Sequence, residues 1–436
     1  MPSRRIGVAQ AGVGREPWQM SEEFEIHPPA QAEGINGNVA GSHRRRSRHR
    51  RSRRSGMSAA EGPALRLEGY LARRDDGKAL LVSAKNKFHP KPTDPAIDAA
   101  LVATLHLDPG LRLEVNAATV KGQARPQVTE ILAIEGLTPE DYRAKAIPFS
   151  ELTSIDPCDR FRLETAADLL EPRVLDLVTP IGRGQRCLIV APPKAGKTTL
   201  LQQIAHAIAI NHPEVVIFVL LVDERPEEVT DWKRTIVQGE VFASSSDEAM
   251  QSHIEISEMV IERARRLVEL GGDVIILMDS LTRMSRAYNN NQKSSGRIMS
   301  GGIDARTMEK PRRFFGSARK IEGGGSLTIV ATCLVDTGSR MDEVIFQEFK
   351  GTGNMEVVLT RDLFERRIFP CVHIPQSGTR KEEKLYPKAD IERIFLLRRA
   401  LAALAPHDAM QLLLSKLKQS RSNAEFLATI QSPAGR

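Results

Sequence analysis

The pattern of hydrophobic and polar positions changes twice along the 436 residues of this chain. Residues 1–60 show no periodicity and are rich in Gly, Ser, Pro and Arg, a composition typical of disorder. Residues 62–135 contain short strand-like runs between turns, and from residue 180 to about 400 longer apolar strands alternate with helices. The pattern predicts a disordered tail, a small β domain and an α/β domain.

Strand-like runs in the second region are expected at 65–72, 79–82, 111–115 and 128–132. Their number and length predict a small all-β barrel of the oligonucleotide-binding type. Such barrels bind single strands by stacking bases on aromatic side chains. The aromatic residues here are few, namely Tyr70, Phe88 and, just outside, Tyr142. The basic residues suit either RNA or an ordinary solvated face; they are Arg73, Arg74, Lys78, Lys85 and Lys87.

The third region predicts a parallel sheet covered by helices. Its strands are expected at 186–190, 215–222, 273–279, 326–333 and 368–374. Its helices are expected at 197–210, 250–269 and 304–319, and an amphipathic helical tail at 390–430. The expected domains are a tail over 1–60, a divergent cold-shock-like barrel over 61–140, a Pro-containing connector over 141–180, and an ATPase domain with C-terminal helices over 181–436.

A phosphate-binding loop is predicted where the first strand of the α/β region meets its first helix. The segment reads Ala191-Pro-Pro-Lys-Ala-Gly-Lys-Thr198 and follows an apolar run. Converging backbone N–H groups and the helix N-terminus favour phosphate there. Lys197 is expected to reach the outer phosphates, and the Thr198 hydroxyl is expected to bind Mg²⁺. The first Gly of the general pattern is replaced by Ala191.

Two acidic residues at strand ends suit nucleotide hydrolysis. Asp279 closes the buried run 273–279, where an acid holds Mg²⁺ in phosphate-loop enzymes. Glu224 follows the run 215–222, which we expect beside the phosphate-loop strand. From there its carboxylate is placed to orient a water for attack on the γ-phosphate. Taken singly, either acid is as readily a strand-end marker.

Two further segments carry charge in loops. Residues 289–302 form a polar, Gly-rich loop whose Lys293 and Arg297 suit a polyanion. Arginines also follow the last strands, over 361–367 and at Arg380. Such arginines can reach a neighbouring subunit's γ-phosphate, although sequence alone leaves them as surface charges.

Composition narrows the function classes further. The longest apolar run, 215–222, is too short to span a membrane, and no signal-peptide-like stretch opens the chain, so we expect a cytoplasmic protein. The four cysteines lack metal spacing, and Cys187 and Cys333 are expected to be small core residues. Net charge is +7, but removing the eight arginines of residues 44–54 leaves −1. This Arg run is a nucleic-acid-binding arm, a solvated tail, or sequence upstream of a true start at Met57.

These motifs together make residues 145–385 resemble the ATPase domain of the Rho family of transcription termination factors, ring-shaped bacterial RNA translocases. The leading Ala191, which departs from the general phosphate loop, is typical of this family. The other matching segments are 223–229, 279–283, 312–316, 323–330, 336–340, 348–354 and 377–383. The family also has a barrel rich in aromatic residues that stack pyrimidines. Residues 62–135 match that barrel loosely and lack its aromatic run.

The resemblance implies a role for each matching residue. Glu224 activates water, Arg225 gates the site, and Arg380, with Arg367 beside it, resembles the arginine finger given in trans. Asp279 and Thr198 hold Mg²⁺, and Phe369 stacks on adenine. The phosphates are bound by Lys194, Ala195, Gly196, Lys197, Thr198 and Thr199. The pore loops that grip RNA match Arg297, Ile298, Met299, Ser300 and, in a second loop, Arg340, with Arg297 and Arg340 standing where the family has Lys.

The function implied is that of an ATP hydrolase and RNA helicase that terminates transcription by pulling single-stranded RNA through a homohexameric ring. Its cofactors are ATP and Mg²⁺. Its partners are single-stranded RNA and the RNA polymerase elongation complex, without a membrane. Two alternatives are a rotary ATP synthase-type subunit with the same RecA-like core and a non-catalytic RNA-binding hexamer. The intact Lys197, Glu224, Asp279 and Arg380 oppose the second alternative.

Overall fold

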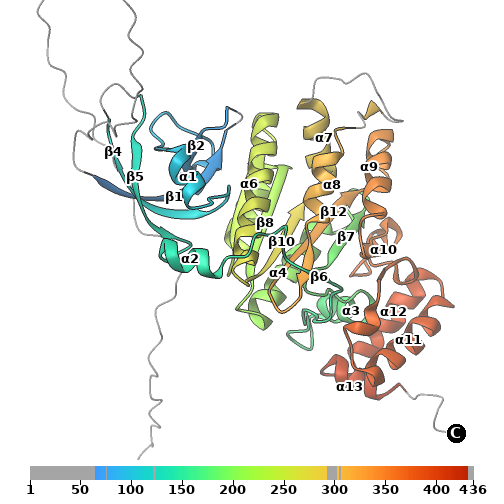
Figure 1. The fold of residues 1–436 in the computed structure, drawn as a ribbon. Helices are drawn as coiled ribbons and strands as arrows, with labels where there is room; N and C mark the ends of the chain where they lie inside the picture. Colours follow the sequence, from blue (N-terminus) through green and yellow to red (C-terminus); the bar gives the residue numbers. More distant parts are fainter. Residues whose placement is uncertain (1–63, 75, 121–123, 292–301, 304–305, 431–436) are drawn as a thin grey trace, which may run out of the picture. The chain divides into compact units, whose positions relative to one another are not determined.

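The computed structural model describes residues 64–74, 76–120, 124–291, 302–303 and 306–430 (Figure 1). The expected tail over 1–60 lies outside the described residues. The first described unit of structure is a closed barrel with the strand order β1-β2-β3-β5-β4. Its strands are β1 (Leu65–Arg73), β2 (Ala79–Val82), β3 (Ala96–Ile97), β4 (Arg112–Ala118) and β5 (Gln127–Ile134).

The barrel confirms the predicted all-β fold and adds a strand. The two-residue β3 was not expected, because a strand of that length shows no alternation of apolar and polar positions. Between β2 and β4 the chain forms a short 3₁₀ turn, η1 (Ala84–Asn86), and the helix α1 (Ala99–Thr104). The barrel interior is apolar and includes Leu71, Leu113 and Ile134, all without solvent exposure.

The rest of the chain builds a nine-stranded sheet with the main order β14-β13-β7-β12-β10-β8-β9. All neighbours from β13 to β9 are parallel, as predicted. The two short strands β11 and β6 extend it beside β12. The strands are β6 (Ser154–Ile155), β7 (Arg186–Ala191), β8 (Val216–Glu224), β9 (Glu240–Ser245), β10 (Asp273–Asp279), β11 (Arg319–Ile321), β12 (Ser326–Leu334), β13 (Met355–Val358) and β14 (Gly378–Thr379).

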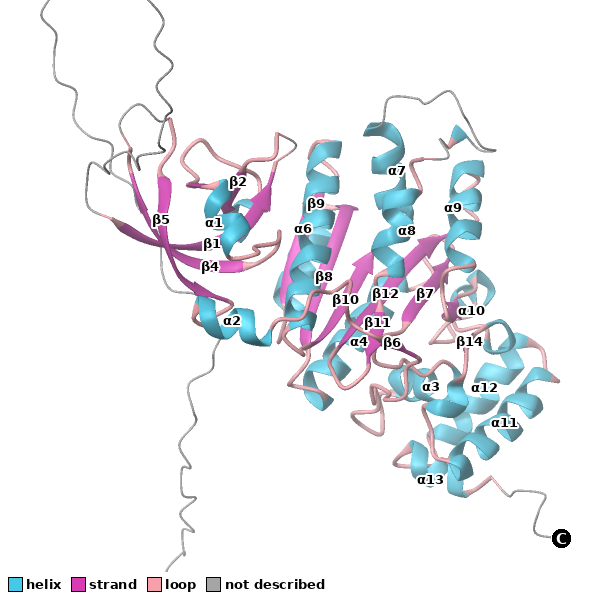
Figure 2. Ribbon diagram, in the orientation of Figure 1, coloured by secondary structure: helices cyan, strands magenta, loops and turns pink. Residues whose placement is uncertain are grey.

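Helices cover both faces of this sheet (Figure 2). The described helices after the barrel are α2 (Pro139–Lys145), α3 (Leu170–Val178), α4 (Lys197–Asn211), α5 (Pro226–Thr235), α6 (Met250–Glu269), α7 (Leu281–Asn291), α8 (Glu309–Gly316), α9 (Arg340–Lys350), α10 (Arg361–Glu365), α11 (Lys388–Ala402), α12 (Pro406–Leu417) and α13 (Asn423–Ala428), with 3₁₀ turns η3 (Ile374–Gln376) and η4 (Glu382–Lys384). Of these, α2 packs against β5 of the barrel rather than against the large sheet. Among these described helices, none combines the length and apolar composition needed to cross a membrane.

The central strands β7, β8, β10 and β12 are mainly apolar, and almost all of their residues are buried. Along β8, Ile217, Val219 and Leu221 join the core beneath α3, α4, α5 and the C-terminal helices. The alternate residues of the same strand join the core beneath α6, α7, α8 and α9. Continuous apolar runs of this kind are what a parallel sheet between two helical layers requires. Cys187 and Cys333 lie buried in β7 and β12, as predicted.

The structure corrects several predicted elements. Residues 368–374 form no ladder strand, only an isolated bridge between Leu359 and Val372. Pro370 lacks the N–H that a ladder needs, and β13 and β14 form this edge instead. The helix expected at 304–319 is shorter, since α8 spans Glu309–Gly316. The helical tail is confirmed as three separate helices, α11 to α13, while β9 and α7 were not predicted.

Candidate nucleotide-binding site

The loop between β7 and α4 has the shape of a phosphate cradle. Gly196 precedes α4 in a left-handed conformation, with φ of 85°, and Lys194 has φ of 68°. Such backbone turns aim successive N–H groups at one point. A Cβ at Gly196 would touch nothing within 4 Å, so this Gly is required for its backbone conformation rather than for space. The N–H groups of the first turn of α4 have no partners within the helix and face the same point.

Lys197, Thr198 and Asp279 converge at this loop. The Lys197 Nζ lies 2.6 Å from Asp279 Oδ2 and 3.3 Å from Thr198 Oγ1. The Thr198 hydroxyl donates to the same Asp279 oxygen at 3.3 Å. The other Asp279 oxygen accepts a 2.8 Å hydrogen bond from the Thr332 hydroxyl on β12. Asp279 is 1% exposed, so neighbouring side chains hold its carboxylate in one orientation.

Glu224 reaches the same place from another strand. Its Oε2 lies 3.6 Å from Lys197 Nζ, and its Oε1 accepts a 3.0 Å hydrogen bond from Arg283 Nη1. The side chain is 1% exposed, and Oε2 has no hydrogen-bond partner in the described structure. Burial and the nearby charge of Glu224 raise the pKa of Glu228 on α5. Glu224 therefore presents one carboxylate oxygen that accepts no hydrogen bond in the described structure and lies next to the phosphate-loop lysine.

The position of β8 differs from the sequence-based expectation. We expected β8 beside β7, but β12 and β10 lie between them. Glu224 approaches the loop because β8 bulges at its end, where Asp223 has φ of 56° and the register with β9 shifts. A bulge turns the following side chain toward a new direction, which compensates for the two intervening strands.

The donor set at Asp279 and Thr198 fits Mg²⁺. A carboxylate and a hydroxyl are hard oxygen ligands, and Mg²⁺ is commonly bound by one or two carboxylates together with substrate phosphates. Among the described residues no group of three or more His, Cys, Asp or Glu forms a protein-only metal site. The residues present therefore suit an ion that shares its ligands with a nucleotide.

The remaining predicted nucleotide contacts lie around the loop. Lys194 and Thr199 are exposed, whereas Ala195 is buried. Arg225 is exposed and precedes α5, and its backbone N–H donates to Glu224 Oε1 at 3.1 Å. Phe369 is 41% exposed and packs edge-on against Phe364, with ring centroids 5.9 Å apart. An exposed ring supported on one side is free to receive a base on the other.

The two predicted finger arginines are not part of this cluster. Arg380 follows β14, the edge strand that only β13 separates from β7, and its N–H donates to Asn354 O just before β13. It lines a polar pocket of about 310 Å³ with Asn354, Glu382 and Arg398. Arg367 is exposed, with its guanidinium 5.7 Å from the Phe364 ring centroid. The described contacts join neither arginine to Lys197, Glu224 or Asp279. Within one chain the site therefore lacks both.

The predicted pore-loop residues Arg297, Ile298, Met299 and Ser300 lie outside the described residues. Arg340 begins α9. Two arginines of α7, Arg283 and Arg286, were given no role from the sequence. Arg286 on α7 forms a bidentate ion pair with Asp342, which is 1% exposed, and Arg283 on the same helix contacts Glu224. The motif 279–283 contained Arg283, but a short motif does not reveal a partner on another strand.

The aromatic residues of the barrel region are buried or half-buried. Phe88 is 3% and Tyr142 is 5% exposed. Tyr70 packs edge-on against Phe88, and the guanidinium of Arg263 lies 5.5 Å from its ring. Lys87 is paired with Glu248. The other basic residues Arg73, Arg74 and Lys78 line a groove of about 970 Å³ with Arg125 and His106. In the described barrel these three aromatic rings offer no stacking platform.

Comparisons with known proteins agree with this geometry. Residues 172–379 match the ATP synthase alpha/beta family, nucleotide-binding domain. A solved ATPase from the type III secretion system of pathogenic bacteria superposes with a TM-score of 0.54 at 19% identity, covering 64% of this chain and 86% of that one. An ATP synthase subunit from Nanoarcheaum equitans superposes with a TM-score of 0.52 at 16% identity, covering 65% and 81%. At these identities the likeness shows the fold alone.

Sequence relatives are much closer. Transcription termination factor Rho of Cereibacter sphaeroides is 47% identical over 378 residues, covering 86% of this chain and 89% of that protein. The factor of the same name from Akkermansia muciniphila is 48% identical over 372 residues, covering 85% and 78%. Identity at this level covers more than four fifths of this chain and more than three quarters of each relative, and the chain belongs to the transcription termination factor Rho family.

Proposed function

We propose that this chain is an ATP-driven RNA translocase that terminates transcription, working as a homohexamer with ATP bound between subunits. The observation that carries the proposal is the convergence of Lys197, Asp279 and Glu224, from three separate elements, on one phosphate loop. Family membership supports the RNA substrate and the ring. The rotary ATP synthase-type alternative rests on the family match over residues 172–379 and on fold likeness at under 20% identity. The relatives that are 47–48% identical over most of the chain favour the Rho-type function instead.

In this proposal each residue of the cluster has one task. Lys197 moves from Asp279 to the outer phosphates when a nucleotide binds. Asp279 and Thr198 would hold Mg²⁺, which would neutralise charge on the phosphate oxygens. The unpartnered Oε2 of Glu224 takes a proton from the attacking water. As water adds to the γ-phosphorus, the bond to the bridging oxygen breaks, giving ADP and inorganic phosphate.

The arrangement of the arginines supports a site completed by a second subunit. Among the described residues, Arg380 and Arg367 make no contact with Lys197, Glu224 or Asp279 of their own chain. In a ring we expect them to serve the neighbour's γ-phosphate. An arginine supplied in trans stabilises the charge of the transition state. Two further residues complete the proposed site. Arg225, next to Glu224 in the chain, gates it, and Phe369 stacks on the adenine. Residues 297–300 and Arg340 are the proposed RNA contacts within the pore.

The test is ATP turnover measured with and without single-stranded RNA. Wild type should hydrolyse ATP faster when RNA is present. Glu224→Gln should bind a fluorescent ATP analogue normally and lose about 10²–10⁴-fold in turnover, since it loses a general base. Glu227→Gln, which changes an exposed acid three residues away, is the matched control. Turnover that is indifferent to RNA, or unaffected by Glu224→Gln, would contradict the proposal.

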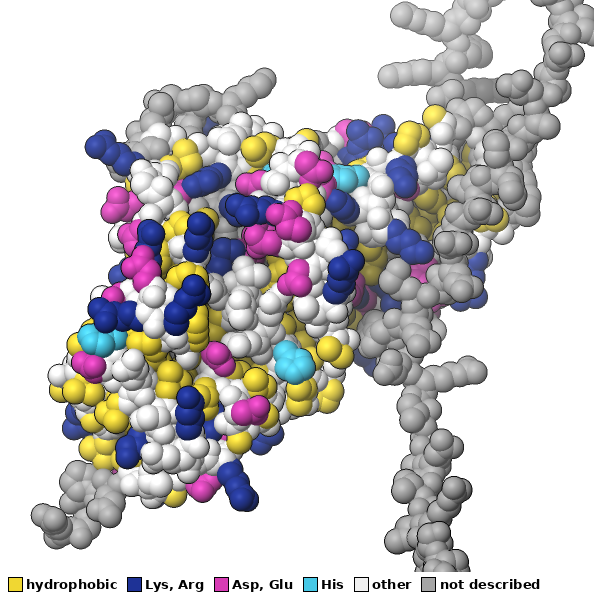
Figure 3. All heavy atoms as spheres, turned by 180° about the vertical axis from the view of Figure 1, so that it is seen from behind, with side chains coloured by type: hydrophobic (Ala, Val, Ile, Leu, Met, Phe, Trp, Pro, Cys, Tyr) yellow, Lys and Arg dark blue, Asp and Glu magenta, His cyan; other side chains and the backbone are white. Residues whose placement is uncertain are grey.

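We also infer that RNA capture by this chain is mainly electrostatic. Phe88 and Tyr142 are buried and Tyr70 is half-buried. The groove of the barrel is lined by basic residues together with Asp76 and Asp108. The face seen in Figure 3 carries acidic and basic side chains intermixed. In the sequence the net charge is +7, and removing the eight arginines of residues 44–54 leaves −1, so the excess positive charge lies in that run. Base stacking contributes about 1–3 kcal/mol per base, whereas phosphate contacts carry no base preference and weaken with salt.

Binding of pyrimidine and purine homopolymers at two salt concentrations tests this second point. Affinity should fall steeply with salt, differ little between the two polymers, and decrease when residues 1–56 are removed. A pyrimidine preference that persists at high salt and survives the truncation would mean that the barrel reads bases.

A further inference from the structure

A three-residue turn of the barrel region, Lys87-Phe88-His89, is fastened to the ATPase fold by three different interactions. Lys87 pairs with Glu248, and Phe88 packs on Phe242 of β9 with ring centroids 5.6 Å apart. His89 contacts Glu255 Oε2 at 2.7 Å through Nδ1 and Ser252 Oγ at 2.8 Å through Nε2. An ion pair, a ring contact and two hydrogen bonds from consecutive residues make this turn a rigid attachment.

The backbone of the turn is itself constrained. Lys87 and Phe88 both adopt left-handed conformations, with φ of 53° and 61°. Two successive side-chain-bearing residues rarely occupy this region, and such a conformation persists only where surrounding contacts impose it. Here the contacts include the Phe88 N–H donating to Ser83 O at 3.1 Å and the Asn86 side chain donating to His89 O at 2.6 Å. The strain indicates that the three side chains are held toward the ATPase fold.

The contacts continue from the turn to the end of β9. Glu248 accepts hydrogen bonds from the Ser245 backbone N–H at 2.8 Å, the Ser245 hydroxyl at 2.9 Å and the Ser252 hydroxyl at 2.8 Å. Burial opposes ionisation of Glu248, but the Lys87 ammonium and these donors outweigh it and lower its pKa to about 2. The carboxylate therefore stays charged near neutral pH and fixes Ser245.

Ser245 and Ser246 lie opposite the catalytic carboxylate residue. Ser245 pairs with Glu224 in the β8–β9 register, and the Ser246 N–H donates to Glu224 O at 2.9 Å. This is the point where β8 bulges and directs Glu224 toward Lys197. The contacts that fix the end of β9 therefore also fix the backbone of Glu224, through Ser245 and Ser246.

We propose that Lys87, Phe88 and His89 are positioning residues for ATP hydrolysis, which hold Glu224 in register through Glu248 and the end of β9. The barrel then contributes to the hydrolytic geometry in addition to any contact with RNA. This inference rests on the proposed role of Glu224. In this proposal Lys87 serves through its ion pair with Glu248 rather than as an RNA contact.

The test compares Lys87→Met and His89→Ala with wild type. We expect kcat for ATP to fall about ten-fold, both with and without RNA, because sub-ångström misplacement of a catalytic group costs one to two powers of ten. KM for ATP and affinity for RNA should stay unchanged, since β7, α4 and the barrel groove are not altered. Lys87→Arg, which keeps the charge, should restore most of the activity.

The matched control is Lys85→Met. Lys85 lies in the preceding 3₁₀ turn η1 and is exposed, and its side chain has no ion pair or hydrogen bond among the described residues. The double variant Lys87→Met with Glu248→Gln should be no slower than the slower single variant, because both changes break one interaction. A melting curve for each variant ensures that rates are compared on folded protein.

Three results would overturn the inference. They are a kcat for Lys87→Met equal to that of Lys85→Met, a loss of RNA affinity at normal kcat, and a rise in KM together with the fall in kcat that Lys87→Arg does not reverse. Each leaves the proposed function standing if wild type hydrolyses ATP in an RNA-dependent way. The absence of RNA-stimulated turnover in wild type would instead contradict the proposed function itself.

Discussion

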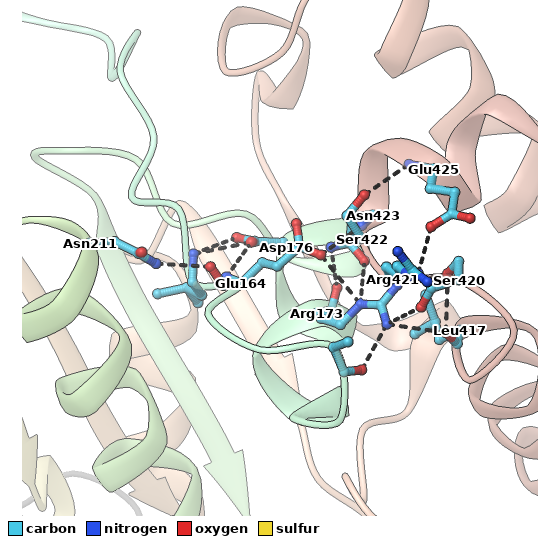
Figure 4. Close-up of polar contacts among 12 residues, drawn as sticks. Glu164, Arg173, Asp176, Asn211, Leu417, Ser420, Arg421, Ser422, Asn423 and Glu425 are labelled. Carbon is cyan, nitrogen blue, oxygen red and sulfur yellow. Dashed lines mark hydrogen bonds and ion pairs between the residues drawn. The ribbon is translucent and has the colours of Figure 1, made fainter. Parts of the chain in front are cut away.

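Replacing Arg173 by Met should loosen the C-terminal helices from the ATPase core. Arg173 on α3 has no solvent exposure, and its guanidinium donates to Ala167 O, Leu417 O, Ser420 O, the Ser420 hydroxyl and Asn423 Oδ1 at 2.8–3.2 Å (Figure 4). Glu164 lies 3.4 Å from its Nε. Leu417 O belongs to the last turn of α12, where carbonyls lack helical partners and a cation is favoured.

The magnitude follows from what the substitution leaves behind. Methionine keeps the apolar stem but removes every donor, so buried carbonyls lose their partner. The Glu164 carboxylate loses its ion pair and keeps the hydrogen bond from the Asn423 N–H. Hydrogen bonds to a charged group contribute about 1.5–3 kcal/mol each, but they are not additive, and the desolvation of the guanidinium is regained. Removal of one member of a buried ionic cluster costs about 3–5 kcal/mol, which is the loss we expect here.

Hydrogen exchange over residues 406–428 measures this loss where it occurs, because regions of a large protein open locally. A loss of 3–5 kcal/mol corresponds to exchange roughly a hundred- to several-thousand-fold faster, since about 1.4 kcal/mol is a factor of ten. Arg399→Met, on an exposed position of α11 without a described ion pair, is the control. Unchanged protection of 406–428 in Arg173→Met, or equal acceleration in the control, would refute the reasoning.

Other expected outcomes concern the nucleotide site and the thiols. Phe369→Ala should raise KM for ATP several-fold with little change in kcat, because it removes the exposed ring proposed to stack on adenine; steady-state kinetics checks this, and an unchanged KM counts against the stacking role. Mixing Arg380→Ala and Lys197→Ala subunits should give more ATPase activity than the two variants measured separately, since some interfaces then pair an intact loop with an intact arginine; a purely additive rate leaves Arg380 without a role in trans. At pH 8 a thiol reagent should label one cysteine quickly, the exposed Cys158. Burial raises the pKa of the Cys333 thiol to about 12, that of the Cys371 thiol to about 11 and that of the Cys187 thiol well above its usual value. These three thiols therefore stay protonated and unreactive at pH 8. Rapid labelling of more than one thiol would contradict their burial.

Local sequence determined much of this protein. The segment from Cys187 to Thr198 specifies a strand, a Gly-containing turn and a helix start, and the structure has all three. The apolar runs that end at Asp279 and near Glu224 predict two buried parallel strands, each with an acid at its carboxyl end. These features need only the periodicity of neighbouring residues and the conformational freedom of Gly196, so they can be read without knowledge of the fold.

Only the tertiary structure decided which distant residues meet. The order of strands places β12 and β10 between the phosphate-loop strand and β8, and a bulge rather than adjacency brings Glu224 to Lys197. The partners Thr332 and Arg283, the burial of Phe88 against β9 and the enclosure of Arg173 likewise join segments far apart in sequence. Such pairings depend on how whole layers pack, because hydrophobic periodicity tells which face of a strand is buried but not which neighbour covers it.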